Sequence, residues 1–388
     1  MGVIEIRVPT EDDLAAIVRA DGRIFGAVYT EQDQASMRSV TDLGRFRIAV
    51  DRGAVVGCSG SFAFDMTLPG GAAVPTGGVT WVSVAVTHRR QGLLGRLLEA
   101  THEDIDQRGE PLAALTASEG GIYERFGYGI ASRSRVTSLD RHRAGLRAEF
   151  VPASRDVRVV EPEDALADIA AVWERFRRLR PGELTRSEAW WRAMFADGGP
   201  SAVHVLHPDG YAFWQVEARW RDGHPAHEMQ LHMLAAVTPE AHAALWHTVV
   251  SADLVGTIIS RRIPVDDPLP YLLRDQRALR TTGLNDGLWC NVRDVPACFG
   301  ARTYGTDDDV VVEVDGRRWR LGPGGAQRVR TRPDLVTDHA SLGALLLGGT
   351  APTDLAAGRR LTARSPELLR RADAHFVHRP APHTQTGF

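Results

Sequence analysis

Residues 81–98 read WVSVAVTHRRQGLLGRLL, and this stretch decides the fold. An apolar, β-branched strand runs into a loop of arginines and glycines, and this loop opens an amphipathic helix. The first N–H groups of a helix have no partner within it and carry the positive end of its dipole, so they bind anions. Gly92 and Gly95 keep Cβ atoms away from such an anion. The stretch therefore predicts a backbone cradle for a pyrophosphate.

The loop differs from the two common phosphate-binding loops. No Gly-Lys-Ser/Thr follows its glycines, as a Walker A loop requires, and it lacks the G-x-G-x-x-G fingerprint of dinucleotide-binding proteins. It resembles instead the acetyl-CoA loop of the GNAT N-acetyltransferases, which has the pattern Arg/Gln-x-x-Gly-x-Gly/Ala after a V-x-V strand. Residues 89–94, RRQGLL, match this pattern except at Leu94, where the family has a small residue.

The composition is typical of a soluble globular protein with two or three domains. The chain has 388 residues, of which 43% are hydrophobic. A net charge of -3 argues against a nucleic-acid-binding surface, which needs a concentrated excess of basic charge. The sequence contains no lysine, so all 46 basic residues are arginines. Together with the heavy use of alanine, this indicates a GC-rich bacterial genome.

The cysteines and the hydropathy pattern indicate a cytoplasmic protein. Cys58, Cys290 and Cys298 are too few and too scattered for a disulfide framework or a zinc site, so we expect no metal. The N-terminus lacks the basic and apolar regions of a signal peptide, and no apolar run approaches the length of a membrane span. We therefore expect no membrane partner.

Strand and helix patterns predict three units with mixed α+β structure. The first contains an acidic helix start at residues 9–13, and its other predicted elements are strands at 4–8, 45–50, 55–64, 79–86 and 112–117 and a helix at 93–108. The second opens in the same way after residues 141–155. The third, from about Cys290, has an alternating stretch at 310–314 and helical runs at 342–347 and 368–376.

The second unit is predicted to be a copy of the first that has lost its anion cradle. Residues 232–246, HMLAAVTPEAHAALW, parallel the strand and helix that begin at Ser83. Pro239-Glu240-Ala241 stands where the first copy has its arginines and glycines. This replacement adds a negative charge and removes the glycines, so we expect no pyrophosphate to bind there.

The whole chain resembles the Eis (enhanced intracellular survival) family of acetyltransferases. The motifs that carry the resemblance are PTEDD at 9–13, THRRQGLL at 87–94, ASEGGIY at 117–123, RFGYG at 125–129, HPDGY at 207–211, DPLP at 267–270, DGLW at 286–289 and the final Phe388. The resemblance implies an α+β fold with an active GNAT domain at 1–150, a degenerate GNAT-like domain at 151–289 and a sterol-carrier-like domain at 290–388.

The resemblance also implies an activity and a cofactor site. It implies acetyl transfer from acetyl-CoA to primary amines of multi-amine small molecules such as aminoglycosides, by a homohexamer. The backbone of the strand binds the thioester carbonyl and the pantetheine arm, the loop binds the pyrophosphate, and two residues add cofactor contacts. These residues are Val82, Ser83 and Val84; Arg90, Gln91, Gly92, Leu93, Leu94 and Gly95; and Ser118 and Glu119.

Two catalytic roles follow from the same resemblance. Tyr123 is the general acid that protonates the leaving sulfur. A phenol gives its proton to the thiolate only as that charge forms, so its position matters more than its acidity. The α-carboxylate of Phe388, folded back into the active site, is the general base, with Thr384 and Thr386 available for hydrogen bonds that anchor the tail. Residues 383–388 carry no acidic side chain, so we expect weaker affinity for polycationic amines.

The acceptor pocket has no local signature. Phe25, Phe62 and Trp81 are candidate aromatic walls, and the acids that could attract an amine are Asp21, Asp65 and Glu119. Two alternatives remain open at this point: a protein lysine acetyltransferase, and a non-catalytic lipid or small-molecule carrier that uses the C-terminal domain. A purely structural role for that domain is the favoured interpretation.

Overall fold

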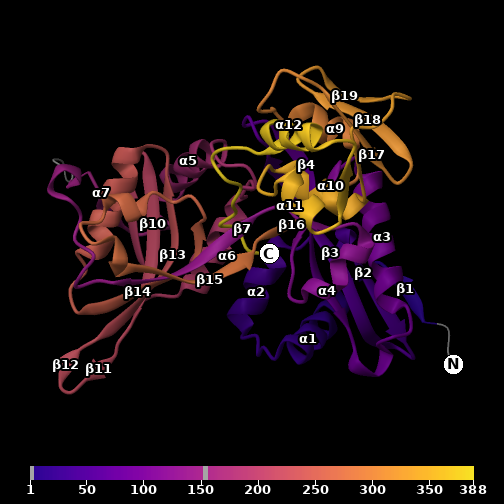
Figure 1. Ribbon diagram of the computed structural model, residues 1–388. Coiled ribbons are helices and arrows are strands. Elements are labelled where there is room, and N and C mark those ends of the chain that lie inside the picture. Colours follow the sequence, from indigo (N-terminus) through magenta and orange to yellow (C-terminus); the bar gives the residue numbers. More distant parts are fainter. Residues whose placement is uncertain (1–3, 152–155) are drawn as a thin grey trace.

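The computed structural model describes residues 4–151 and 156–388, and its two largest parts are seven-stranded sheets that lie side by side (Figure 1). A third, smaller unit with a five-stranded sheet packs on the first of them. The C-terminus lies between the two large sheets (Figure 1). In the described residues, no helix is both long enough and apolar enough to cross a membrane.

The first sheet carries the strand and loop that opened the sequence analysis. Its strands, in spatial order, are β1 (Glu5–Arg7), β2 (Phe46–Asp51), β3 (Ala54–Thr67), β4 (Ala73–Val84), β5 (Leu112–Thr116), β16 (Leu288–Val292) and β6 (Gly129–Ile130). Its helices are α1 (Leu14–Phe25), α2 (Glu31–Val40), α3 (Leu93–Gln107) and α4 (Gly120–Tyr123). The predicted strands and the predicted helix at 93–108 are confirmed within three residues at each end, except that β4 begins six residues before the predicted start at 79.

The second sheet repeats this plan. Its strands, in spatial order, are β15 (Leu279–Asp286), β7 (Arg133–Asp140), β14 (Val255–Pro264), β13 (His227–Ala236), β10 (Gly210–Glu217), β9 (Val203–His207) and β8 (Arg158–Val160). Its helices are α5 (Leu166–Arg177), α6 (Glu188–Gly198), α7 (Pro239–Val250) and α8 (Leu269–Leu272), and a small hairpin joins β11 (Trp220–Arg221) to β12 (His224–Pro225). As predicted, β13 and α7 correspond to β4 and α3.

The two sheets exchange strands. β7 follows the first unit directly but pairs with β14 and β15 of the second sheet. β16 then returns to the first sheet, between β5 and β6. Sheet membership therefore does not follow the predicted boundaries at 150/151 and 289/290. β7 precedes the first boundary but belongs to the second sheet, and β16 spans the second boundary but belongs to the first sheet. Those boundaries stay predictions.

The third unit is a small α+β domain. Its strands, in spatial order, are β19 (Gly325–Arg328), β18 (Arg317–Gly322), β17 (Val310–Val314), β20 (Leu335–Thr337) and β21 (Leu361–Ala363). Its helices are α9 (Val295–Ala301), α10 (His339–Leu346), α11 (Pro352–Ala357) and α12 (Pro366–Phe376). The predicted strand at 310–314 and the helical runs at 342–347 and 368–376 are confirmed by β17, α10 and α12.

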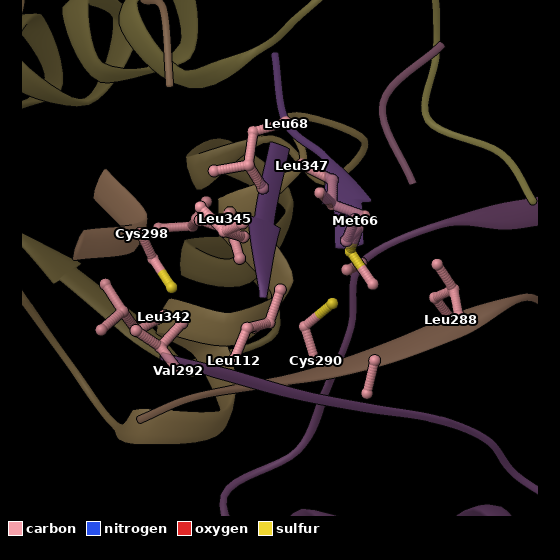
Figure 2. Close-up of a cluster of buried hydrophobic side chains, with 14 of the residues drawn as sticks. Met66, Leu68, Leu112, Leu288, Cys290, Val292, Cys298, Leu342, Leu345 and Leu347 are labelled. Carbon is pink, nitrogen blue, oxygen red and sulfur yellow. The ribbon is translucent and has the colours of Figure 1, made fainter. Parts of the chain in front are cut away.

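One apolar core joins the third unit to the first sheet. Figure 2 shows side chains from both units in contact, and the labelled ones are Met66, Leu68, Leu112, Leu288, Cys290, Val292, Cys298, Leu342, Leu345 and Leu347. At this junction α10 lies close to the backbone of the sheet. A Cβ added at Gly343 of α10 would collide with the backbone carbonyl of Cys290, and one added at Gly129 would collide with the carbonyl of Ala340.

We expect Gly343→Ala to destabilise the protein by about 1–3 kcal/mol, because the added methyl group must push α10 away from β16. Thermal unfolding measures the effect as a lower Tm. Gly324→Ala is the matched control, since a Cβ there meets nothing within 4 Å. Equal Tm values for the two variants would show that the close approach of α10 to β16 does not limit the stability of the protein.

Candidate active site

The site is built around a separation of two parallel strands. β4 and β5 are paired at only three positions, from Thr76–Leu112 to Gly78–Ala114, and then diverge. We call the space between Val79–Val84 and residues 115–118 the fork. It contains a cavity of about 350 Å³, lined by Asp21, Phe25, Tyr29, Met37, Val79, Thr80, Trp81, Val82, Thr116, Ala117, Ser118, Tyr123 and Phe388.

A bulge in β4 turns the backbone at the fork. The register of β3 against β4 shifts between Cys58 and Gly60, so that two residues of β4 lie opposite one of β3. Trp81, in the bulge, has a φ of 51°, in the left-handed region that bulky residues rarely adopt. Bulges re-aim side chains and backbone groups near functional sites. The bulge directs Trp81 and Val82 to the cavity wall.

The loop predicted to bind pyrophosphate has the required donors. Gly92 is the N-cap of α3 with a φ of 77°, and the first backbone bond of the helix runs from Arg96 N to Gly92 O. The N–H groups of Leu93, Leu94 and Gly95 therefore have no partner within the helix. A Cβ at Gly92 would meet nothing within 4 Å. Open backbone donors at a helix N-terminus fit the diphosphate of acetyl-CoA.

Other residues predicted to contact the cofactor surround the fork. Val82 and Ser118 line the cavity. The hydroxyl oxygen of Ser83 is buried and has no hydrogen-bond partner among the described residues. Val84 ends β4 and is half-buried, and Glu119 is exposed just beyond Ser118. Arg90 and Gln91 lie on the loop that leads to α3, and Arg90 has a φ of 62°.

Tyr123 is a buried phenol at the cavity wall. Its relative exposure is 5%, and its ring packs edge-on against Tyr128 with centroids 6.1 Å apart. Burial raises the pKa of Tyr123, a hydrogen bond with Ser118 opposes this rise, and the charge of Glu119 adds to it. The phenol is therefore protonated at neutral pH and can act as a proton donor.

Phe388 lies at the base of the fork. Thr116 Oγ1 donates a hydrogen bond of 3.1 Å to its backbone oxygen, and its ring packs against Phe64 with centroids 5.1 Å apart. A Cβ added at Gly78 would lie 3.0 Å from the ring of Phe388. Gly78 is the last residue of β4 that pairs with β5. The terminal residue and Tyr123 therefore line the same cavity.

The tail that delivers Phe388 is buried from Ala381 to Thr386. The backbone N–H of Gln385 donates to both carboxylate oxygens of Glu183, at 3.2 and 3.1 Å. Arg186 Nε donates to the hydroxyl of Thr386 at 3.0 Å, and the backbone N–H of Thr386 donates to the Thr384 hydroxyl at 3.2 Å. Thr384 and Thr386 thus form the local hydrogen bonds that were expected of them.

The second copy also has a fork, and the tail fills it. β13 and β14 pair in parallel from His227–Val255 to Leu231–Ser260 and then separate. Beyond that point the side-chain amide of Gln385 bonds to the backbone of Leu234 in both directions, at 3.1 Å each. The hydroxyl of Thr238 accepts from Ala241 N and so occupies a donor at the start of α7. Together with Glu240, this leaves a poorer anion site than the one at α3.

The predicted acceptor residues are divided between two places. Phe25 and Trp81 line the cavity, as does Asp21, which accepts a hydrogen bond of 2.6 Å from the Tyr29 hydroxyl. Burial raises the pKa of Asp21. Phe62 does not line this cavity, because it is buried against Phe46, Phe64 and Trp190. Asp65 does not line this cavity either. It is exposed, and its backbone N–H donates a hydrogen bond to the hydroxyl of Thr185.

Sequence reasoning missed several residues that build the site. Thr116, Tyr29 and Met37 line the cavity, and Glu183 and Arg186 hold the tail. None of them stands in a motif. Glu183 and Gln385 are far apart in the sequence, so no local pattern predicts their contact.

The diverging strands, the bulge and the glycine-capped helix define a GNAT acetyltransferase. Residues 5–131 and 182–293 each match an acetyltransferase (GNAT) domain, and residues 295–385 match a sterol carrier protein domain. The chain belongs to the Eis family of N-acetyltransferases.

Its relatives resemble it over nearly their whole length. It is 35% identical over 391 residues to N-acetyltransferase Eis of Mycobacterium tuberculosis, and the matched region covers 95% of this chain and 96% of the relative. It is 36% identical over 396 residues to an uncharacterized N-acetyltransferase of Streptomyces coelicolor, with 94% and 95% covered. The crystal structure of Eis1 from Mycobacterium abscessus has a TM-score of 0.88 to it, at 32% identity, with both chains fully covered.

The carboxyl group of Glu183 makes stability depend on pH. Burial raises its pKa to about 7 from 4.5, against the charge of Arg186 and the hydrogen bond from Gln385, which lower it. A carboxyl whose pKa is higher in the folded state favours folding at low pH, and this contribution is lost as pH rises to about 7. Glu183→Gln keeps an acceptor for Gln385 but does not titrate. We expect its Tm to rise relative to that of the wild type as pH increases from 4.5 to about 7.

Thermal unfolding at a series of pH values tests this expectation. Glu99→Gln is the matched control, because Glu99 is exposed on α3 and has no ion pair or hydrogen bond in the described ranges. Its curve should run parallel to that of the wild type. A parallel curve for Glu183→Gln would mean that the buried carboxyl is not what titrates.

Proposed function

We propose that this N-acetyltransferase transfers acetyl directly from acetyl-CoA to a primary amine of a small molecule, with Tyr123 as general acid and the C-terminal carboxylate of Phe388 as general base. One observation carries the proposal: Tyr123 and Phe388 line one cavity, at the fork between β4 and β5. A proton donor and a proton acceptor that share one cavity match the needs of aminolysis.

The donor acetyl-CoA supplies a thioester. Backbone N–H groups of Val82, Ser83 and Val84 would bind its carbonyl and pantetheine arm, and the N-terminus of α3, from Arg90 to Gly95, would bind its pyrophosphate. Ser118 and Glu119 stand on the opposite side of the fork.

Each proton has an assigned carrier in this proposal. The Phe388 carboxylate takes a proton from the ammonium group of the acceptor, and the neutral amine forms the bond to the acetyl carbon. As the C–S bond breaks, the Tyr123 phenol gives its proton to the sulfur. The proton that the nitrogen loses as the amide forms restores the phenol, and the Phe388 carboxyl releases its proton to solvent. The raised pKa of Tyr123 keeps the phenol protonated until that moment. Thr116 holds the carboxyl group of Phe388 in place.

The acceptor in this proposal is a multi-amine small molecule, with aminoglycosides as the predicted class. The aromatic rings of Phe25 and Trp81 and the carboxyl of Asp21 in the cavity support an amine-bearing substrate. The homohexamer and the cytoplasmic location stay predictions. Light scattering of the purified protein measures the first of them.

We expect Tyr123→Phe to lower kcat by about 10²–10⁴-fold, the usual contribution of a general acid or base. Release of free thiol from acetyl-CoA in the presence of an amine panel measures kcat, and calorimetry with acetyl-CoA should give an unchanged Kd. Tyr271→Phe is the control, because Tyr271 is exposed and does not line the cavity. Unchanged turnover of Tyr123→Phe would remove the phenol from the mechanism.

We expect residues added after Phe388, or amidation of its carboxyl, to lower kcat by at least about 10²-fold with the same Tm. Either change removes the terminal charge next to Thr116, while Glu183 and Leu234 still hold the tail. The same residues added before Met1 are the control. Full activity of the extended protein would refute the assignment of the base.

A further inference from the structure

A second cavity adjoins the first at the end of the tail. Its volume is about 530 Å³, and it lies between the two large sheets, lined by α2, α6, β10, β13, β14 and residues 385–387. Gly387 lines this cavity and Phe388 lines the first. Helix α2 likewise contributes Val40 to the second and Met37 to the first. A substrate whose amine reaches Phe388 therefore has this second cavity next to it.

The second cavity has an excess of positive charge. Its wall contains the guanidinium groups of Arg186, Arg261 and Arg262 and the carboxylate of Asp197, and the charge of the buried Glu183 acts on Arg186 and Arg262 from behind the wall. Burial lowers the pKa of His232, the remaining titratable group of the wall, so it adds no charge near neutral pH. We call this space the basic cavity.

Arg261 and Arg262 are available for a ligand. Within residues 4–151 and 156–388, no ion pair or side-chain hydrogen bond engages either guanidinium group, and both line the cavity. Both residues follow Ser260 directly, where β14 separates from β13. Deeper in the wall, the guanidinium group of Arg186 lies over the rings of Trp173 and Trp191, and its Nη2 has no hydrogen-bond partner among the described residues. Arg261 and Arg262 are exposed at the cavity wall, and guanidinium groups bind carboxylates and phosphates through paired hydrogen bonds.

The penultimate residue makes room for one of these groups. A Cβ added at Gly387 would lie 2.5 and 2.7 Å from Nη2 and Nη1 of Arg262. The guanidinium group of Arg262 is therefore in contact with the backbone of Gly387, one residue from the proposed base. Any larger residue at this position would displace it.

We propose that the acceptor carries an anionic group, a carboxylate or a phosphate, in addition to its amine, and that Arg261 and Arg262 bind this group. The inference rests on the proposed acetyl transfer to an amine, and it replaces aminoglycosides, which are polycations without an anionic group, as the predicted acceptor class. The amine lies at Phe388 and Asp21, and the anionic end lies in the basic cavity. Arg261 and Arg262 repel a polycation there, so such an acceptor is disfavoured in comparison.

Matched acceptors test the inference with the full-length enzyme and acetyl-CoA. The carboxylates are the ω-amino acids from β-alanine to ε-aminocaproate, and phosphoethanolamine serves as the phosphate. Their neutral counterparts are the ω-amino carboxamides, and their cationic counterparts are the diamines and kanamycin. We expect kcat/KM to be at least about tenfold higher for an anionic acceptor than for its carboxamide. Comparison of the carboxylate and phosphate arms identifies the anion.

Variants locate the effect. Arg261→Gln and Arg262→Gln should each lower the ratio of kcat/KM between an anionic acceptor and its carboxamide by about tenfold. A merely structural role in holding the tail would lower both values and leave the ratio unchanged. Arg280→Gln is the control, because Arg280 is exposed on β15 and outside the basic cavity.

The two proposals fail in different ways. A preference for diamines or kanamycin that the arginine variants do not alter would overturn the inference and leave the proposed function intact. If no amine releases thiol and calorimetry detects no binding of acetyl-CoA, the proposed function falls, and the inference falls with it.

Discussion

The active site depends on one constraint, the short pairing of β4 with β5. Once the two strands separate after Gly78 and Ala114, the backbone groups of β4 on that side lose their strand partner and must bond elsewhere. The absence of a side chain at Gly78 also admits two rings, since a Cβ there would lie 2.5 Å from Phe64 and 3.0 Å from Phe388. The residue that ends the pairing thus makes room for the last residue of the chain.

The tail connects the two copies of the fold. Its Gln385 amide gives Leu234 the two hydrogen bonds that a neighbouring strand would give, within the fork of the second copy. Phe388 then reaches the fork of the first. The second copy has poor donors for a pyrophosphate, but its open strand edge still binds a peptide segment. This binding gives the second copy a structural role, because it fixes the position from which residues 386–388 extend into the fork of the first copy.

The sequence predicts the parts of this arrangement that are local. The strand, loop and helix of residues 81–98 follow from their own residues, and so does the loss of glycines at Pro239–Ala241. The exchange of β7 and β16 does not, because pairing partners of short strands are set by tertiary contacts. Phe62 shows the same limit. Alternation places it on one face of β3 with Phe64, but only the fold reveals that Trp190 covers it.

The third unit fixes the position at which the C-terminal tail begins, and the tail reaches the active site. The buried guanidinium group of Arg302 donates to the carbonyls of Leu345, Leu346 and Phe376, and so fixes the ends of α10 and α12 to each other. α12 ends at Phe376, and the tail begins there. A lipid carrier needs free apolar space, whereas the leucines of α10 are packed against the first sheet (Figure 2). Anchoring the tail is a use of this domain that its packing supports.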